Sequence, residues 1–217
     1  MVIGSVASIY RRLQVHSLSA QSPAAGDPVD TVSLGQQALA YVQSLDLTST
    51  TRGYLPSEAQ KEADARLTQV RQAASTGTTA WEAIQRSAAA AEEHRAGNCG
   101  EMADLAYREL KNRGVDNLAS VTAESRNRFY GIPKANHGFV VAGLAPDADL
   151  ARPETWGDQA IVVDPFHDFC GPAEEGLAKV RAYMERCGCE QFSLQDSVVK
   201  GRGEQDELAW NNLRTRL

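Results

Sequence analysis

The sequence predicts an α+β fold, with helices in its first half and a mainly antiparallel sheet in its second half. Apolar residues recur three and four positions apart in several segments between residues 33 and 113, which is the period of amphipathic helices. Short runs rich in valine and isoleucine follow between residues 119 and 164, as in buried strands. Helices segregated from strands in this way pack on one side of a sheet. A chain of 217 residues is most simply one domain.

Two amphipathic helices are expected near the start of this domain. The apolar spacing predicts a first helix over residues 33–46, and the Gly and Pro of residues 53–56 interrupt it. Ser57 is suited to cap a second helix over residues 57–74, because Gln60 stands three positions later.

Two further helices should follow. Thr78 or Thr79 can cap the first of them, which should end near Arg95, just ahead of a glycine. The second begins at Cys99 and should end before Gly114.

The β-rich part of the chain is shorter. The candidate strands are residues 119–123, 137–143 and 160–164. Residues 144–158 between them form an irregular, proline-containing excursion, and a late helix is expected over residues 177–186. Residues 126–136 have the composition of a polar loop, and the chain beyond residue 186 has no clear pattern.

Composition and charge exclude two classes of partner. The net charge is −6, whereas binding to nucleic acid rests on clustered Lys and Arg. No apolar run approaches the roughly 18 to 20 residues of a membrane span. The chain has four cysteines, too few for the dense pairing of a small secreted scaffold, so reduced thiols are expected.

Cys99 stands where a reactive thiol is expected. Asn98 is a strong N-cap and Glu101 follows three positions later, a capping-box arrangement that makes Cys99 the first residue of its helix. Unpaired amides and the helix dipole favour a negative charge there, and only the thiolate is a strong nucleophile. The amides of Cys99 and Gly100 could also bind an oxyanion, and Gly100 leaves room for a substrate.

A histidine and an aspartate follow in the order that thiol chemistry requires. His137 opens one strand, and Asp164 closes another just before a proline. An imidazole can take the thiol proton, and a third residue holds the imidazole in the right tautomer. Paired strands could bring Asp164 close to His137 across the 27 residues between them.

Other residues could take the place of Asp164. Asp168 and His167 are the nearest alternatives, and Asn136 is a candidate for a Cys-His-Asn site. Asn136 is the less suitable of these, because neighbours along one strand point to opposite faces. A turn-forming role for Asp164 is the alternative to orienting His137.

Residues 97–103, His137 and residues 163–165 resemble the core of transglutaminase-like proteins within the papain-like superfamily. The resemblance covers roughly residues 95–170 and implies a Cys-His-Asp triad of Cys99, His137 and Asp164. It also implies a nucleophile helix packed on an antiparallel sheet, with an N-terminal helical segment added. An aromatic residue soon after the histidine is typical of the family, and Phe139 could serve.

No residue upstream of Cys99 stands out as a second group that would bind the oxyanion. Gln85 and Trp81 lie on the helix before Cys99, and either could contribute. The helices before residue 80 match no part of the family's core and could form a lobe that recognises the substrate.

Within this superfamily, bacterial effector and toxin deamidases, transglutaminases and cysteine proteases are similar in size and order of residues. The resemblance therefore implies a thiol-dependent enzyme that acts on a protein amide, most simply an effector glutamine deamidase or transglutaminase. A papain-like protease is the first alternative, and a non-catalytic binding module on the same fold is the second. The expected partner is a protein, such as a host protein. No cofactor and no metal is needed.

A zinc site is a competing interpretation of other residues. His167, Cys170, Cys187 and Cys189 include suitable ligand types, but their spacing differs from that of the common zinc half-sites. A disulfide between Cys170 and either of the later cysteines is a further alternative.

The domain organisation that we expect has two parts. Residues 1–30 are rich in Ser and Ala and predict a disordered tail, or a leader for a bacterial needle-type secretion system. A secretory signal peptide is not expected, because a basic leader is missing. Residues 31–217 form one catalytic domain, with a helical segment (31–95), the Cys-His-Asp core (96–170), and a C-terminal helix with an irregular tail (171–217). The expected location is the bacterial cytoplasm before export, and then a host cell.

Overall fold

The computed structural model describes residues 30–74, 79–126, 133–189 and 191–198 and has an α+β fold. Four helices precede the strands: α1 (Thr31–Ser44), α2 (Ser57–Ala74), α3 (Ala80–His94) and α4 (Cys99–Asn112). A fifth helix, α5 (Ala173–Arg186), comes late in the chain. The predicted order of helices first and strands second is confirmed.

The strands of the described chain form one five-stranded sheet. They are β1 (Leu118–Arg126), β2 (Pro133–Ala142), β3 (Ile161–Asp164), β4 (Phe169–Pro172) and β5 (Ser193–Val198). The spatial order is β4-β3-β2-β1-β5, and every neighbouring pair is antiparallel. Short 3-10 turns, η1 (Pro153–Thr155) and η2 (Pro165–His167), precede and follow β3.

The second half of the chain is more regular than its sequence predicts. β4 and β5 form in segments for which no strand was predicted, and β1 and β2 extend into the segment expected as a polar loop. β4 is four residues long and contains Gly and Pro, so its residue types do not indicate a strand. β5 is polar and lies at the other edge of the sheet. The predicted N-terminal tail, Thr78 and the end of the chain lie outside the described residues.

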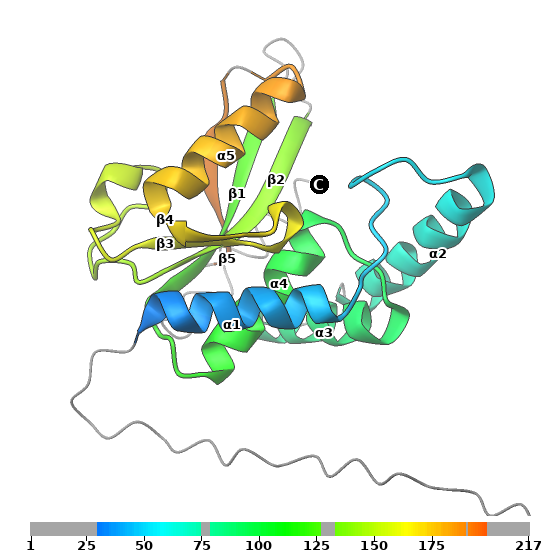
Figure 1. The fold of residues 1–217 in the computed structure, drawn as a ribbon, viewed down its shortest axis with the longest axis horizontal. Helices are drawn as coiled ribbons and strands as arrows, with labels where there is room; N and C mark the ends of the chain where they lie inside the picture. The colour runs from blue at the N-terminus through cyan, green and yellow to red at the C-terminus, as the bar shows by residue number, and fades with distance from the viewer. Residues whose placement is uncertain (1–29, 75–78, 127–132, 190, 199–217) are drawn as a thin grey trace, which may run out of the picture.

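The two faces of the sheet are buried by different helices. Along β3, Ile161 and Val163 belong to the core that contains α1, α3 and α4, whereas Val162 belongs to the core that contains α5. This alternation is the two-residue period of a strand buried on both sides. Figure 1 shows the same layering, with α1 and α4 on one side of β3 and β4 and α5 on the other.

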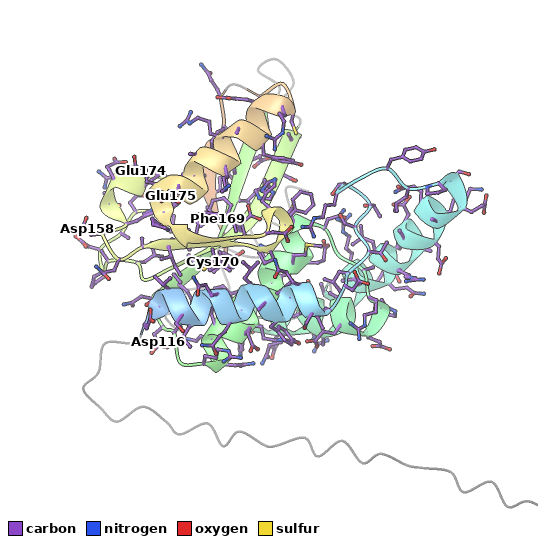
Figure 2. All side chains as sticks on the ribbon, viewed as in Figure 1. Asp116, Asp158, Phe169, Cys170, Glu174 and Glu175 are labelled. Atoms are coloured by element: carbon purple, nitrogen blue, oxygen red, sulfur yellow. The ribbon has the colours of Figure 1, made fainter. Side chains whose placement is uncertain are left out.

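Two glycines let helices approach β3 and β4 closely. A Cβ added to Gly35 of α1 would lie 2.7 Å from Cys170 Sγ, and a Cβ on Gly176 of α5 would lie 2.4 Å from Val162 Cβ. Figure 2 shows Cys170 on the side of β4 that faces α1. The central strand β3 is therefore held between two helices at short distance.

The α2 helix packs mainly on α3 and lies away from the sheet (Figure 1). It buries Ala63, Leu67 and Val70 and exposes a charged face. Arg71 near its end forms an ion pair with Glu101 of α4 at 3.0 Å. Among the described residues, no helix is both long and apolar enough to cross a membrane.

The segment that follows α1, residues 46–52, is called the strap here. Its Thr48 pairs with the turn between α3 and α4: Thr48 N–H donates to Arg95 O at 2.9 Å, and Gly97 N–H donates to Thr48 O at 3.1 Å. The strap therefore lies directly beside the start of α4.

Replacing Gly176 by alanine tests the close packing of α5. The added methyl group meets Val162 in a filled core, so Gly176→Ala should lower the free energy of unfolding by about 1–3 kcal/mol and the melting temperature by several degrees. Gly53→Ala is the control, because a Cβ there would meet nothing within 4 Å. Calorimetry should separate the two variants, and equal melting temperatures would contradict this account of the packing.

Candidate active site

Cys99 is the first residue of α4, as predicted, and is partly buried. The helix start is anchored from two directions. Asn98 Oδ1 accepts hydrogen bonds from Ser49 Oγ at 2.9 Å and from Thr50 N–H at 3.0 Å, both in the strap. Glu101 accepts the backbone N–H of Asn98 at 2.9 Å. These contacts fix the end of the helix from which the thiol projects.

The backbone around Gly100 is open on one side and tightly packed on the other. Gly100 is exposed, and a Cβ there would meet nothing within 4 Å, so the first amides of the helix are accessible to a ligand. On the packed side, a Cβ added to Gly138 of β2 would lie 3.3 Å from Gly100 Cα. Gly138 therefore allows β2 to pass directly beside the start of α4.

His137 is fully buried and bonded to Asp164. Its Nε2 lies 2.8 Å from Asp164 Oδ2. The pairing of β2 with β3 explains this contact, because Val141 is opposite Val162, and the same register places Asp164 two residues from His137 on the same face. The sheet thus brings together two residues that are 27 positions apart.

Asp164 ends β3 and also caps the η2 turn. Its Oδ2 accepts a second hydrogen bond, from His167 Nδ1 at 2.7 Å, and its Oδ1 accepts the backbone N–H of His167 at 3.2 Å. Burial raises the pKa of Asp164, but the hydrogen bonds from His137 and His167 outweigh burial and lower it to about 2. The buried group is therefore a carboxylate at neutral pH.

The charge of Asp164 sets the protonation of His137. A carboxylate only accepts hydrogen bonds, so Nε2 of His137 carries a proton and Nδ1 is the atom left for Cys99. Among the described residues, His137 Nδ1 is the one buried side-chain nitrogen or oxygen without a hydrogen-bond partner. Burial lowers the pKa of His137, but the hydrogen bond to Asp164, the charge of Asp164 and the nearby Cys99 raise it to about 9.

Aromatic rings surround the His137 imidazole. The ring centroids of His167, Tyr183 and Phe166 lie 4.6, 5.0 and 5.5 Å from that of His137, and the Phe139 ring stacks at 6.1 Å. Burial raises the pKa of Tyr183 to about 12, and the nearby Cys187 adds to this shift. These rings keep water away from the His137–Asp164 pair.

The alternative partners of His137 occupy other positions. Asp168 ends η2 and binds Arg52 of the strap and Gln43 of α1 rather than the His137 ring. Asn136 is exposed. His167 shares Asp164 with His137, so it acts on the orienting carboxylate rather than replacing it. From the sequence, His167 was only an alternative to Asp164. The sharing of Asp164 by two histidines could not be predicted, because it depends on the η2 turn.

Trp81 and Gln85 are placed away from Cys99. The Trp81 ring packs on Tyr107 of α4 at 6.2 Å, two helical turns beyond Cys99, and Gln85 is exposed on α3. The short connection between α3 and α4 makes the two helices run in opposite directions, so the start of α3 lies near the end of α4. Of the predicted oxyanion-binding residues, Gly100 alone is at the site.

The described residues contain one group with metal-ligand types close together: His137, Asp164 and His167, whose ligand atoms lie within 4.8 Å of one another. Both histidine nitrogens are at hydrogen-bond distance from the same Asp164 oxygen. Full burial of His137 also leaves no open coordination position, which a catalytic metal requires. Hydrogen bonding therefore accounts for this group better than metal binding does.

The remaining cysteines do not gather around His167. All four cysteines are free thiols. Cys170 faces α1, where its Sγ lies 3.9 Å from Val32 O, whereas Cys189 is buried in the core on the α5 side of the sheet. The zinc site considered for these residues and His167 is thus not assembled. The alternative of a disulfide to Cys170 is not formed either.

No protein-family model matches the chain, and no curated protein or solved structure is significantly similar to it. The chemistry of Cys99, His137 and Asp164 is therefore the guide to function. Their positions are a helix start, a strand beside it and the end of the next strand in the sheet.

Replacing Asp164 should change the titration of His137. In Asp164→Asn the burial that lowers the pKa of His137 remains, while the charge that raises it is lost, so this pKa should fall well below 9. Imidazole resonances followed by NMR across pH measure it. Asp168→Asn is the matched control, because Asp168 binds Arg52 and Gln43. Similar titration curves for both variants would contradict the pairing.

His167 should control stability at low pH. The lowered pKa of Asp164 means that its carboxylate contributes stability above pH 3.8, which is lost as the pH falls through about 2. His167→Leu removes a donor, so stability should fall by about 2 kcal/mol at neutral pH and the acid loss should begin at higher pH. His167→Asn keeps an N–H near the Nδ1 position and should behave like the native protein. Denaturant unfolding at several pH values measures this, and matching acid profiles for Leu and Asn would argue against the role.

Proposed function

We propose that the protein is a thiol-dependent acyl-transfer enzyme with a Cys99-His137-Asp164 triad on a papain-like, transglutaminase-like core. The observation that carries the proposal is the position of His137, bonded to a buried carboxylate through Nε2 while Nδ1 is left for Cys99. The raised pKa of His137 favours an imidazolium, which is the partner that stabilises a thiolate.

The reaction follows from these positions. The Cys99 thiolate attacks the carbonyl carbon of an amide, and the amides of Cys99 and Gly100 are available to stabilise the oxyanion. The imidazolium of His137 donates its proton to the leaving nitrogen, the C–N bond breaks, and a thioester remains on Cys99. Water or an amine then attacks the thioester, His137 takes the proton of this nucleophile, and the C–S bond breaks to restore the Cys99 thiolate beside the His137 imidazolium.

Asp164 serves both steps without changing its own protonation. It holds the Nε2 proton of His137 and stabilises the positive charge that the ring carries before proton transfer. Its low pKa keeps it ionised across the range in which the enzyme would work.

The substrate that we propose is a glutamine side chain of a protein in a host cell, which makes the protein a bacterial effector deamidase or transglutaminase. A cysteine protease is the nearest alternative, because a peptide amide would pass through the same thioester. A binding module on the same fold would not require the raised pKa of His137.

Cys99→Ala tests the proposal. Loss of the nucleophile should reduce activity by at least about a thousandfold, with the fold unchanged by circular dichroism. Native and variant proteins are incubated with a eukaryotic cell lysate, and mass spectrometry searches for deamidated glutamines, cross-links and new chain ends. Cys187→Ser, which changes an exposed thiol, is the control and should remain active. Products that persist in Cys99→Ala would exclude the proposed triad.

A further inference from the structure

A pocket of about 270 Å³ lies between the end of α1, the strap, α4 and η2. Pockets that enclose a whole small molecule are usually about 300–1,000 Å³. This pocket therefore has room for one side chain of a substrate rather than for a cofactor.

The pocket lies next to the proposed nucleophile. Its lining includes Met102, which stands one helical turn after Cys99 on the same side of α4, and Pro165, which directly follows Asp164. Cys99 also packs against the core cluster to which Val42 and Met102 belong. A substrate held at Cys99 can thus place a neighbouring side chain in this pocket.

Four of the residues that line the pocket are apolar. They are Val42, Leu47, Met102 and Pro165, of which all except Leu47 are buried. Such a surface suits the aliphatic part of a long side chain.

The rim of the pocket is charged, and it carries one more carboxylate than cationic groups. Asp168 accepts hydrogen bonds from Arg52 and from Gln43, so the charges of Asp168 and Arg52 offset each other. The other charged group on the rim is Asp46, which is exposed and forms no ion pair within the described part of the chain. Two carboxylates against one guanidinium leave the rim with a net charge of −1.

We propose that this pocket binds a basic side chain of the substrate, Lys or Arg, next to the amide that Cys99 attacks. The cationic group of this substrate side chain forms an ion pair with Asp46, and its aliphatic stem packs against Leu47 and Met102. The inference rests on the proposed function, because it specifies the substrate of the same thiol.

The backbone at Asp46 suits a substitution by Asn. Asp46 follows the C-cap of α1 with φ of 47°, in the left-handed region that Asn also tolerates. Asp46→Asn therefore removes the charge with little change in shape. Asp46→Lys reverses the charge on an exposed residue.

The rate at which Cys99 is modified by small charged reagents tests the pocket without a known substrate. The cation 2-aminoethyl methanethiosulfonate and the anion 2-sulfonatoethyl methanethiosulfonate both form a disulfide with a thiolate and release methanesulfinate. The rates for Cys99 are measured by mass spectrometry, and their cation-to-anion ratio is divided by that for free cysteine. Asp158→Asn is the matched control, because Asp158 is an exposed carboxylate at the far end of the domain from the strap (Figure 2).

The native protein should favour the cation. The ratio should fall about fivefold in Asp46→Asn, fall further in Asp46→Lys, and stay unchanged in Asp158→Asn. Equal ratios in native protein, Asp46→Asn and Asp158→Asn would overturn the pocket while leaving the triad in place. A Cys99 that reacts with neither reagent would overturn the proposed function, and the inference would fall with it.

Glutamine peptides provide the second readout. Peptides with Lys, norleucine or Glu beside the glutamine are compared by ammonia release. Native protein and Asp158→Asn should prefer the Lys peptide over the norleucine peptide by about fivefold or more, and Asp46→Asn should lose this preference. Activity without any preference for Lys would overturn the inference alone.

Discussion

The buried carboxylate of Asp164 is the group on which the rest of the site depends. A charge that is 1% exposed is costly unless donors surround it, and here His137 and both the ring and the backbone of His167 supply them. The donors come from two structural causes. The β2–β3 register supplies His137, and the η2 turn supplies the two groups of His167. Asp164 thus links the end of the sheet, the turn that follows it and the imidazole.

The start of α4 is likewise fixed by contacts from three other segments of the chain. The strap binds Asn98, α2 reaches Glu101 through Arg71, and β2 passes close by at Gly138. The strap also reaches η2 through Arg52 and Asp168. A single segment therefore contacts both the helix of Cys99 and the turn after Asp164, so the relative position of these two groups depends on residues far from either in sequence.

The parts of the site that have local signals could be predicted from the sequence. Asn98 and Glu101 mark the start of α4, and the valine-rich run before Asp164 marks β3. The order of helices and strands followed from periodicity. The strap, the edge strands β4 and β5, and the sharing of Asp164 by two histidines could not be predicted, because each arises from contacts between distant segments. Trp81 is a candidate in the sequence because it lies on the helix before Cys99, but the antiparallel course of α3 and α4 places its ring on Tyr107, two helical turns beyond Cys99.

The contacts of the strap also bear on when the site can form during synthesis. Gln43 and Arg52 meet Asp168 across 125 and 116 residues, so the pocket wall closes only after most of the domain has left the ribosome. Helix α4 can form much earlier from local interactions, and its thiol would then be exposed without His137 beside it. A nascent chain therefore carries a cysteine but no assembled triad, and the thiol acquires its chemistry only once the sheet is complete.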